Sequence, residues 1–200
     1  RWIQHNMTGK TEGLRVSADW FKQRVGVRMT MPAVAGTSVY RAQGPFAKPG
    51  GAAPFLCVRR RAKHTVFTAV HEPFMLAPEQ RPATITGVTR LLPATVDGSR
   101  PEQVAGVIVT SPSFTDYLMV DLADSGSTFV MASDVDQGVD FQFKSYAYVR
   151  VANNAVAARG ELEAFTIAMP DGARPKKVTL NGKRAKFETV DGRVQVRSQR

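Results

Sequence analysis

The sequence lacks features that would place it in several common classes of protein. It has one cysteine, Cys57, which excludes an intrachain disulfide and a zinc site built from cysteines. No apolar run approaches the roughly 18–20 residues of a membrane-spanning helix. With 43% hydrophobic and 22% charged residues, the composition also differs from that of disordered chains, which are poor in apolar residues. We therefore expect a folded chain with no membrane partner.

The beginning of the sequence shows neither an initiator methionine nor a signal peptide. The chain starts with Arg1, and its first ten residues contain no apolar block. These features lead us to expect a piece of a longer protein whose targeting signal lies upstream.

Helical periodicity is missing as well. The apolar segments are short, rich in Val, Thr, Phe and Tyr, and closed by Gly, Pro, Asn or Asp, which is the pattern of β-strands. Asn181-Gly182 and Asp191-Gly192 favour the positive φ angles of hairpin turns. Many short strands at close spacing predict an all-β fold, specifically an antiparallel β-sandwich of layered sheets.

The organisation along the chain changes after residue 151. Residues 139–151 have the pattern of one long strand, and short hairpins follow it to the C-terminus. This change predicts a β-sandwich over residues 1–151, itself part of the larger sandwich of a longer protein. It also predicts a small C-terminal antiparallel sheet over residues 152–200.

Two segments carry expectations about burial. Residues 65–71 are apolar on both faces, which predicts a central strand sheltered on two sides. Cys57 stands in the apolar run Phe55-Leu56-Cys57-Val58, which predicts a buried, unreactive thiol.

The formal charge of +10 points to a polyanionic partner, because a basic field raises the local concentration of polyanions. A tight basic cluster lies at Arg59-Arg60-Arg61, and a looser one extends from Lys176 to Lys186. The interleaved basic and aromatic motifs of single-strand binders are missing, so we expect no nucleic acid partner. The charge is equally compatible with anionic membranes and with acidic polysaccharide.

Residues 55–74 resemble part of the β-sandwich of heparinase II/III-like polysaccharide lyases. There, an apolar strand that ends in basic residues precedes a strand that ends in an acidic residue, a proline and an aromatic. The corresponding segments here are Phe55-Leu56-Cys57-Val58-Arg59-Arg60-Arg61 and Glu72-Pro73-Phe74. Further matches are Val27-Arg28-Met29-Thr30-Met31-Pro32, Gly36-Thr37-Ser38-Val39-Tyr40 and Tyr146-Ala147-Tyr148-Val149-Arg150. Val178-Thr179-Leu180-Asn181-Gly182-Lys183 is similar to the closing sheets of several carbohydrate-active enzymes.

The resemblance implies a parent protein that joins an N-terminal α/α toroid to this β-sandwich and binds an acidic polysaccharide between them. Members of the family cleave uronate-containing chains by β-elimination, in which the uronate carboxylate is neutralised while a base removes the C5 proton. The toroid supplies most catalytic groups, and none of the family's catalytic motifs occurs here. We therefore expect a non-catalytic portion of a periplasmic or secreted lyase, which supports the toroid and lines the cleft. No cofactor is expected within this chain, although a metal ion in the parent enzyme stays open.

The candidate site residues have two interpretations each. The guanidinium forks of Arg59, Arg60 and Arg61 match carboxylate and sulfate groups, but the cluster is also compatible with a solvated hairpin end. His71 is a weak candidate for a catalytic base oriented by Glu72. The alternative has its imidazole satisfied by the backbone and Glu72 on the opposite face of the strand. The three histidines have no metal-site spacing, so we expect no metal site.

A rival hypothesis is a freestanding carbohydrate-binding or adhesion β-sandwich. Tyr146 and Tyr148 lie on one face of a predicted strand and are possible platforms for sugar rings, although core packing is the alternative. Such a module would bind glycans by itself, and its own boundaries would be complete.

Overall fold

A computed structural model describes residues 2–4, 14–20, 25–45, 52–75, 84–94, 103–133 and 139–197. The all-β fold class is confirmed: within these ranges there is no α-helix, and helical turns are short 3-10 elements such as η2 (Pro170–Gly172). None of these segments is a helix long and apolar enough to cross a membrane. The described strands pair antiparallel, except for β12 with β13.

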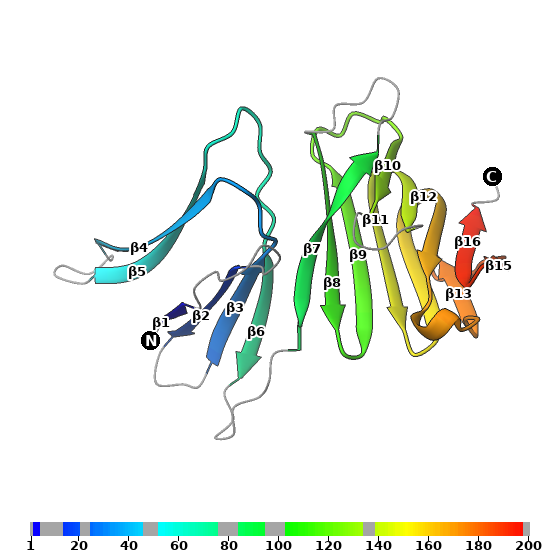
Figure 1. Ribbon diagram of the computed structural model, residues 1–200, viewed down its shortest axis with the longest axis horizontal. Coiled ribbons are helices and arrows are strands. Elements are labelled where there is room, and N and C mark those ends of the chain that lie inside the picture. Colours follow the sequence, from blue (N-terminus) through cyan, green and yellow to red (C-terminus); the bar gives the residue numbers. More distant parts are fainter. Residues whose placement is uncertain are drawn as a thin grey trace.

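The strands form three hydrogen-bonded sheets (Figure 1). A four-stranded sheet has the order β1 (Trp2–Gln4), β2 (Leu14–Trp20), β3 (Val25–Met31) and β6 (Val70–Met75). A two-stranded ribbon consists of β4 (Thr37–Pro45) and β5 (Ala52–Arg60). A ten-stranded sheet contains β7 (Gly87–Ala94), β8 (Val104–Ser111), β9 (Phe114–Asp121), β10 (Phe129–Ala132), β11 (Asp140–Ala152), β12 (Ala155–Ala168), β13 (Lys177–Leu180), β14 (Lys183–Arg184), β15 (Glu188–Val190) and β16 (Arg193–Arg197).

The ten-stranded sheet closes on itself over part of its width. β10 pairs with both β7 and β11, so that β7, β8, β9, β11 and β10 form a hydrogen-bonded ring. The long strand β11 makes this closure possible, because its two halves pair with different strands, and β12 is divided between partners in the same way. β11 pairs with β10 over residues 140–143 and with β9 over residues 146–152. β12 pairs with β13 over residues 155–158 and with β16 over residues 164–168.

Gly160 marks the place where β11 and β12 bend. The register between the two strands shifts between Phe143 and Ala147, and Gly160 lies opposite Ala147 with a φ of +99°. A Cβ atom at this position would collide with the carbonyl oxygen of Tyr146. Only glycine combines this backbone angle with such a close approach.

The main core lies inside the ten-stranded sheet. Large side chains from β9, β10, β11 and β12 meet there, with Phe141 in contact with Tyr117 and Phe165 at ring-centroid distances of 5.0 and 6.4 Å. These residues alternate along their strands with more exposed ones, as the period of two in a strand requires. β13 and β16 add Val178, Val194 and Val196 to the same core.

The β4–β5 ribbon is held by a smaller apolar cluster. Met31 is buried, and Met29, Val39, Leu56 and Val58 pack against it. In Figure 1 the ribbon extends away from the ten-stranded sheet. Its other side, which carries Tyr40 and Cys57, is exposed.

Two expectations about burial are wrong. Residues 65–69 form no strand, and β6 begins only at Val70. Phe67 is exposed, and its ring contacts the guanidinium of Arg60 and not the protein core. Cys57 is exposed, because it lies opposite Tyr40 on the solvent side of the ribbon, whereas Leu56 and Val58 point to the apolar cluster. Both errors arise because burial depends on the partner of a strand, which its own sequence does not specify.

The predicted boundary after residue 151 falls at the end of β11. Val151 pairs with Val156 of β12, and both side chains belong to the main core. The strands on either side of residue 151 are thus hydrogen-bonded to each other. A division into domains 1–151 and 152–200 stays a prediction.

Candidate functional site

The three predicted arginines at the end of β5 have different surroundings. Arg60 is half-buried, and its Nε donates to Thr37 Oγ1 at 2.8 Å. Its Nη1 donates to Thr65 Oγ1 at 2.6 Å and to the carbonyl oxygen of Val66 at 3.1 Å. Arg59 and Arg61 have exposed side chains. Arg60 therefore fixes the segment that follows β5, whereas Arg59 and Arg61 are directed to solvent.

A further cation lies close to this cluster. Burial, and after it the positive charge of Arg90, lowers the pKa of Arg60. Arginine remains protonated at neutral pH even so, because its ordinary pKa lies above about 12. Arg90 of β7 thus adds to the positive field at the end of β5, although the two residues are far apart in the sequence.

An exposed aromatic ring shares the face of Arg59. Tyr40 lies opposite Cys57, and Ser38 lies opposite Arg59. Directly opposed residues of antiparallel strands share a face, so Tyr40 and Arg59 are diagonal neighbours. The Tyr40 side chain is 50% exposed. We call the surface formed by Ser38, Tyr40, Cys57 and Arg59, with Arg61 following the strand, the β4–β5 face.

The β4–β5 face combines two groups that suit acidic sugars. A guanidinium binds a carboxylate through paired hydrogen bonds, and a tyrosine ring offers an apolar body with a polar tip. Sequence analysis identified Arg59 and Arg61 but missed Tyr40. The alternation of Ser38, Val39 and Tyr40 places Ser38 and Tyr40 on one face of their strand. Only the pairing with β5 shows that this face also carries Arg59.

His71 is not paired with the acidic residue beside it. His71 is exposed on β6, whereas Glu72 accepts a hydrogen bond from Arg28 Nη1 at 2.9 Å and another from the backbone N–H of Thr84 at 2.7 Å. Burial acts to raise the pKa of Glu72, but the hydrogen bonds from Thr84 and Arg28 outweigh it and hold the pKa below its ordinary value. Glu72 is therefore an ionised partner of Arg28, and a catalytic role for His71 stays a prediction.

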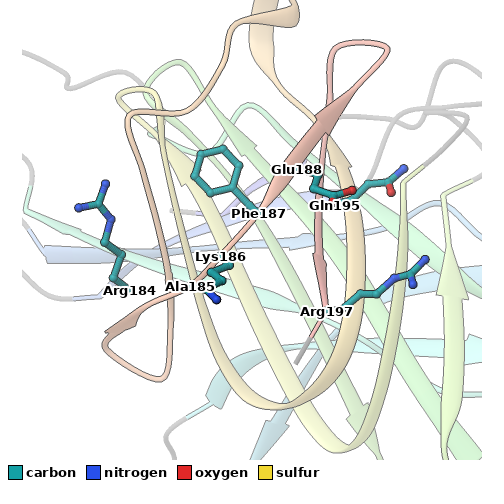
Figure 2. Close-up of a pocket in the computed structure, with 7 residues that line it drawn as sticks. All are labelled: Arg184, Ala185, Lys186, Phe187, Glu188, Gln195 and Arg197. Atoms are coloured by element: carbon teal, nitrogen blue, oxygen red, sulfur yellow. The ribbon is translucent and has the colours of Figure 1, made fainter. Parts of the chain in front are cut away.

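A second basic surface lies at the C-terminal end of the ten-stranded sheet (Figure 2). A hollow of about 640 Å³ is lined by Arg184, Ala185, Lys186, Phe187, Glu188, Gln195 and Arg197. Figure 2 shows the Phe187 ring between Arg184 on one side and the side chains of β16 on the other. Within the described part of the chain, Arg184, Lys186 and Arg197 have no carboxylate partner.

The strand pattern explains how this hollow forms. Val194 and Val196 of β16 point into the core, so Gln195 and Arg197 face outward, with Glu188 directly opposite Gln195. Phe187 packs against the main core, and the guanidinium of Arg174 lies 5.6 Å from the centroid of its ring. The hollow is therefore positive and has an anchored aromatic side chain at its centre.

Metal ligands do not gather in the described residues. No group of three His, Cys, Asp or Glu side chains in that part of the chain is arranged to hold a metal ion.

No protein-family model, curated protein or solved structure matches the chain.

Proposed function

We propose that this chain is the non-catalytic β-sandwich portion of a lyase that cleaves uronate-containing polysaccharide by β-elimination. In this role it supports a catalytic α/α toroid of the same protein and lines the substrate cleft. The observation that carries the proposal is the β4–β5 face, where Arg59 is exposed beside the ring of Tyr40 and Arg61 is exposed just after the strand, while Arg60 fastens the segment behind them.

The charge distribution supports a long acidic ligand. A uronate polymer carries a carboxylate on each uronate unit, so it can contact several cations at once. The formal charge of +10 attracts such a polymer over distances of about a Debye length, roughly 8–10 Å at physiological salt. The hollow at Arg184, Lys186 and Arg197 supplies further positive charge at a second place. Contacts at two places on one polymer raise the overall affinity beyond that of either alone.

The toroid partner and a periplasmic or secreted location belong to the same proposal. They rest on the resemblance of residues 55–74 and of the flanking segments to heparinase II/III-like lyases. The side chains of Arg59 and Arg61, which carry the basic part of that resemblance, are the ones directed to solvent.

Binding by the full 200-residue chain tests the glycan part of the proposal. We expect isothermal titration calorimetry to detect binding of polygalacturonate or alginate and none of a neutral polysaccharide. The double variant Arg59→Gln/Arg61→Gln should weaken binding about tenfold or more, because charge-assisted hydrogen bonds to carboxylates are lost. The matched control Lys176→Gln/Lys177→Gln removes the same charge from two exposed positions at the start of β13, neither of which lines the hollow at Arg184. Equal losses in both variants would show that only net charge matters and would contradict a site on the β4–β5 face.

Activity of the whole parent protein tests the lyase part. Elimination should appear as new ultraviolet absorbance from an unsaturated uronate product, and the isolated chain should produce none. If the parent protein yields no such absorbance on any uronate polymer while the chain alone binds these polymers tightly, the lyase is excluded. The rival hypothesis, a freestanding carbohydrate-binding or adhesion sandwich, would then hold.

A further inference from the structure

A groove runs along β9 on the outer face of the ten-stranded sheet. It has a volume of about 580 Å³. Asp116, Leu118 and Val120 of β9 form its floor, with Tyr146, Tyr148 and Arg150 of β11 on one side. Val107 and Val109 of β8 and the segment from Thr68 to Val70 line the other side. We call this feature the β9 groove.

The exposed side chains of the β9 groove lie in register on neighbouring strands. Tyr146 is opposite Val120, and Tyr148 is opposite Leu118. Leu118 and Val120 are each 39% exposed, and Tyr146 is 54% exposed. The intervening residues of both strands, such as Met119 and Val149, are buried in the core. A contiguous apolar patch on the outside of a well-packed sheet indicates a binding surface.

A hydrogen-bonded network fixes one end of the groove. The buried carboxylate of Asp116 accepts hydrogen bonds from Arg150 Nε and Nη2 at 2.7 Å each and from the hydroxyl of Tyr148 at 3.1 Å. Burial, followed by the charge of Asp116, raises the pKa of Tyr148. The phenol therefore keeps the proton that it donates to Asp116, and both side chains are held in place.

Arg150 is fixed but still presents a donor to the groove. Its guanidinium lies 4.4 Å from the centroid of the Phe114 ring, and its side chain is 43% exposed. Nε and Nη2 donate to Asp116, and the Tyr148 hydroxyl is a further hydrogen-bond neighbour of the guanidinium. A guanidinium carries five N–H donors on its three nitrogens, and Asp116 takes two of them, so Nη1 still has a donor for an oxyanion in the groove.

The charges at the groove favour an acidic occupant. Among the described residues that line the groove, Asp116 is the only carboxylate, and Arg150 neutralises it. Arg159 of β12 is exposed, lies opposite Tyr148 in the sheet, and is close enough to act on its pKa. The groove thus has an apolar floor and exposed rings, with Arg159 as the cation beside it that no carboxylate of the lining neutralises. A second copy of the chain would cover the apolar floor, but each copy has a formal charge of +10, so the two would repel each other.

We propose that the β9 groove is a second subsite for the same class of ligand, an oligosaccharide of uronate units. The apolar faces of the sugar rings lie against Tyr146, Leu118 and Val120, and carboxylates on the ring edges meet Arg150 Nη1 and Arg159. The inference rests on the proposed function for the class of ligand. It adds a site separate from the β4–β5 face.

The experiment is a titration of the full chain with tetragalacturonate, followed by amide NMR and by calorimetry. We expect shift changes at residues 116–120 and 146–150. Tyr146→Ala should weaken binding about tenfold because the exposed ring is a large part of the contact area, and Arg159→Gln should weaken it severalfold. Val190→Ala is the matched control, because Val190 is a 44% exposed apolar residue on β15, outside the groove. Leu118→Ser serves as a second groove variant if Tyr146→Ala fails to fold.

The outcomes separate the two proposals. If Arg59→Gln/Arg61→Gln abolishes binding while Tyr146→Ala and Leu118→Ser leave it unchanged, the β9 groove is refuted and the β4–β5 face stands. If only the groove variants lose affinity, the groove stands and the β4–β5 face is refuted. A concentration-dependent dimer that Tyr146→Ala dissociates, together with no shift changes on adding tetragalacturonate, would assign the groove to a second copy and overturn the inference.

Discussion

The two ends of the molecule differ in how they are stabilised. The strands from β7 to β16 surround one large core in which Phe129, Phe141, Phe143 and Phe165 are buried. The β4–β5 ribbon, among its described side chains, packs on a small cluster around Met31. Stability of an apolar contact scales with the area removed from water, so the first region holds itself together and the second depends far more on its hydrogen bonds. The cations of the β4–β5 face lie on this less buried region.

The largest expected effect tests the main core. Phe141→Ala removes a fully buried ring that contacts Tyr117 and Phe165, so the free energy of unfolding should fall by about 3–5 kcal/mol. Val39→Ala in the ribbon should lower it by about 1 kcal/mol or less, because Val39 is only partly buried. Urea denaturation followed by circular dichroism measures both. Equal losses would show that the two regions share their stability evenly.

A backbone effect comes next. Gly160→Ala places a side chain at a φ of +99° and against the carbonyl oxygen of Tyr146, so we expect a loss of about 2–3 kcal/mol. Gly126→Ala is the control, because Gly126 also has a positive φ of +71° but faces open space, and its loss should be about 1 kcal/mol. Similar values for the two variants would mean that the bend between β11 and β12 tolerates a side chain.

A smaller effect depends on pH and concerns the N-terminal region. The folded-state pKa of Glu72 is lowered, so its contribution to stability is present above the ordinary glutamate pKa and is lost as the pH falls through the lowered value. Glu72→Gln should therefore destabilise the protein by about 1 kcal/mol at pH 7 and by progressively less below about pH 4. Urea midpoints measured between pH 7 and pH 3 provide the comparison. A difference that is constant over this range would refute a contribution from ionised Glu72.

The smallest effect is expected at Cys57. Its side chain is exposed on the β4–β5 face, so Cys57→Ser should change the free energy of unfolding by less than about 0.5 kcal/mol. The thiol of the native protein should react with an aromatic disulfide reagent nearly as fast as that of the urea-unfolded chain. Strong protection in the native state would show that the β4–β5 face is covered.

The sequence predicted the regular part of the fold well and the environment of single residues less well. The turn residues and the alternation of apolar side chains indicated a strand over residues 139–151, close to the observed β11. The same reasoning failed for Phe67 and Cys57, which are exposed. An apolar pattern shows that a residue can be buried, but only its partners in space determine whether it is.

The candidate sites show the same division. Arg59 and Arg61 could be selected from the sequence, because three adjacent arginines form a recognisable cluster. Tyr40 could not be added to them, and neither could the network of Asp116, Tyr148 and Arg150, because strand register brings these residues together from separate segments.

By itself the sequence determined that this protein consists of β-strands with a strong positive charge, since strand period, turn chemistry and net charge are local or additive properties. The tertiary structure alone decided that β10 closes a ring between β7 and β11, and that Arg60 is fastened while its neighbours face solvent. Strand pairing is a contact between distant parts of the chain, and its register selects which side chains share a face. The same register places the rings, the apolar floor and the cations of the β9 groove side by side.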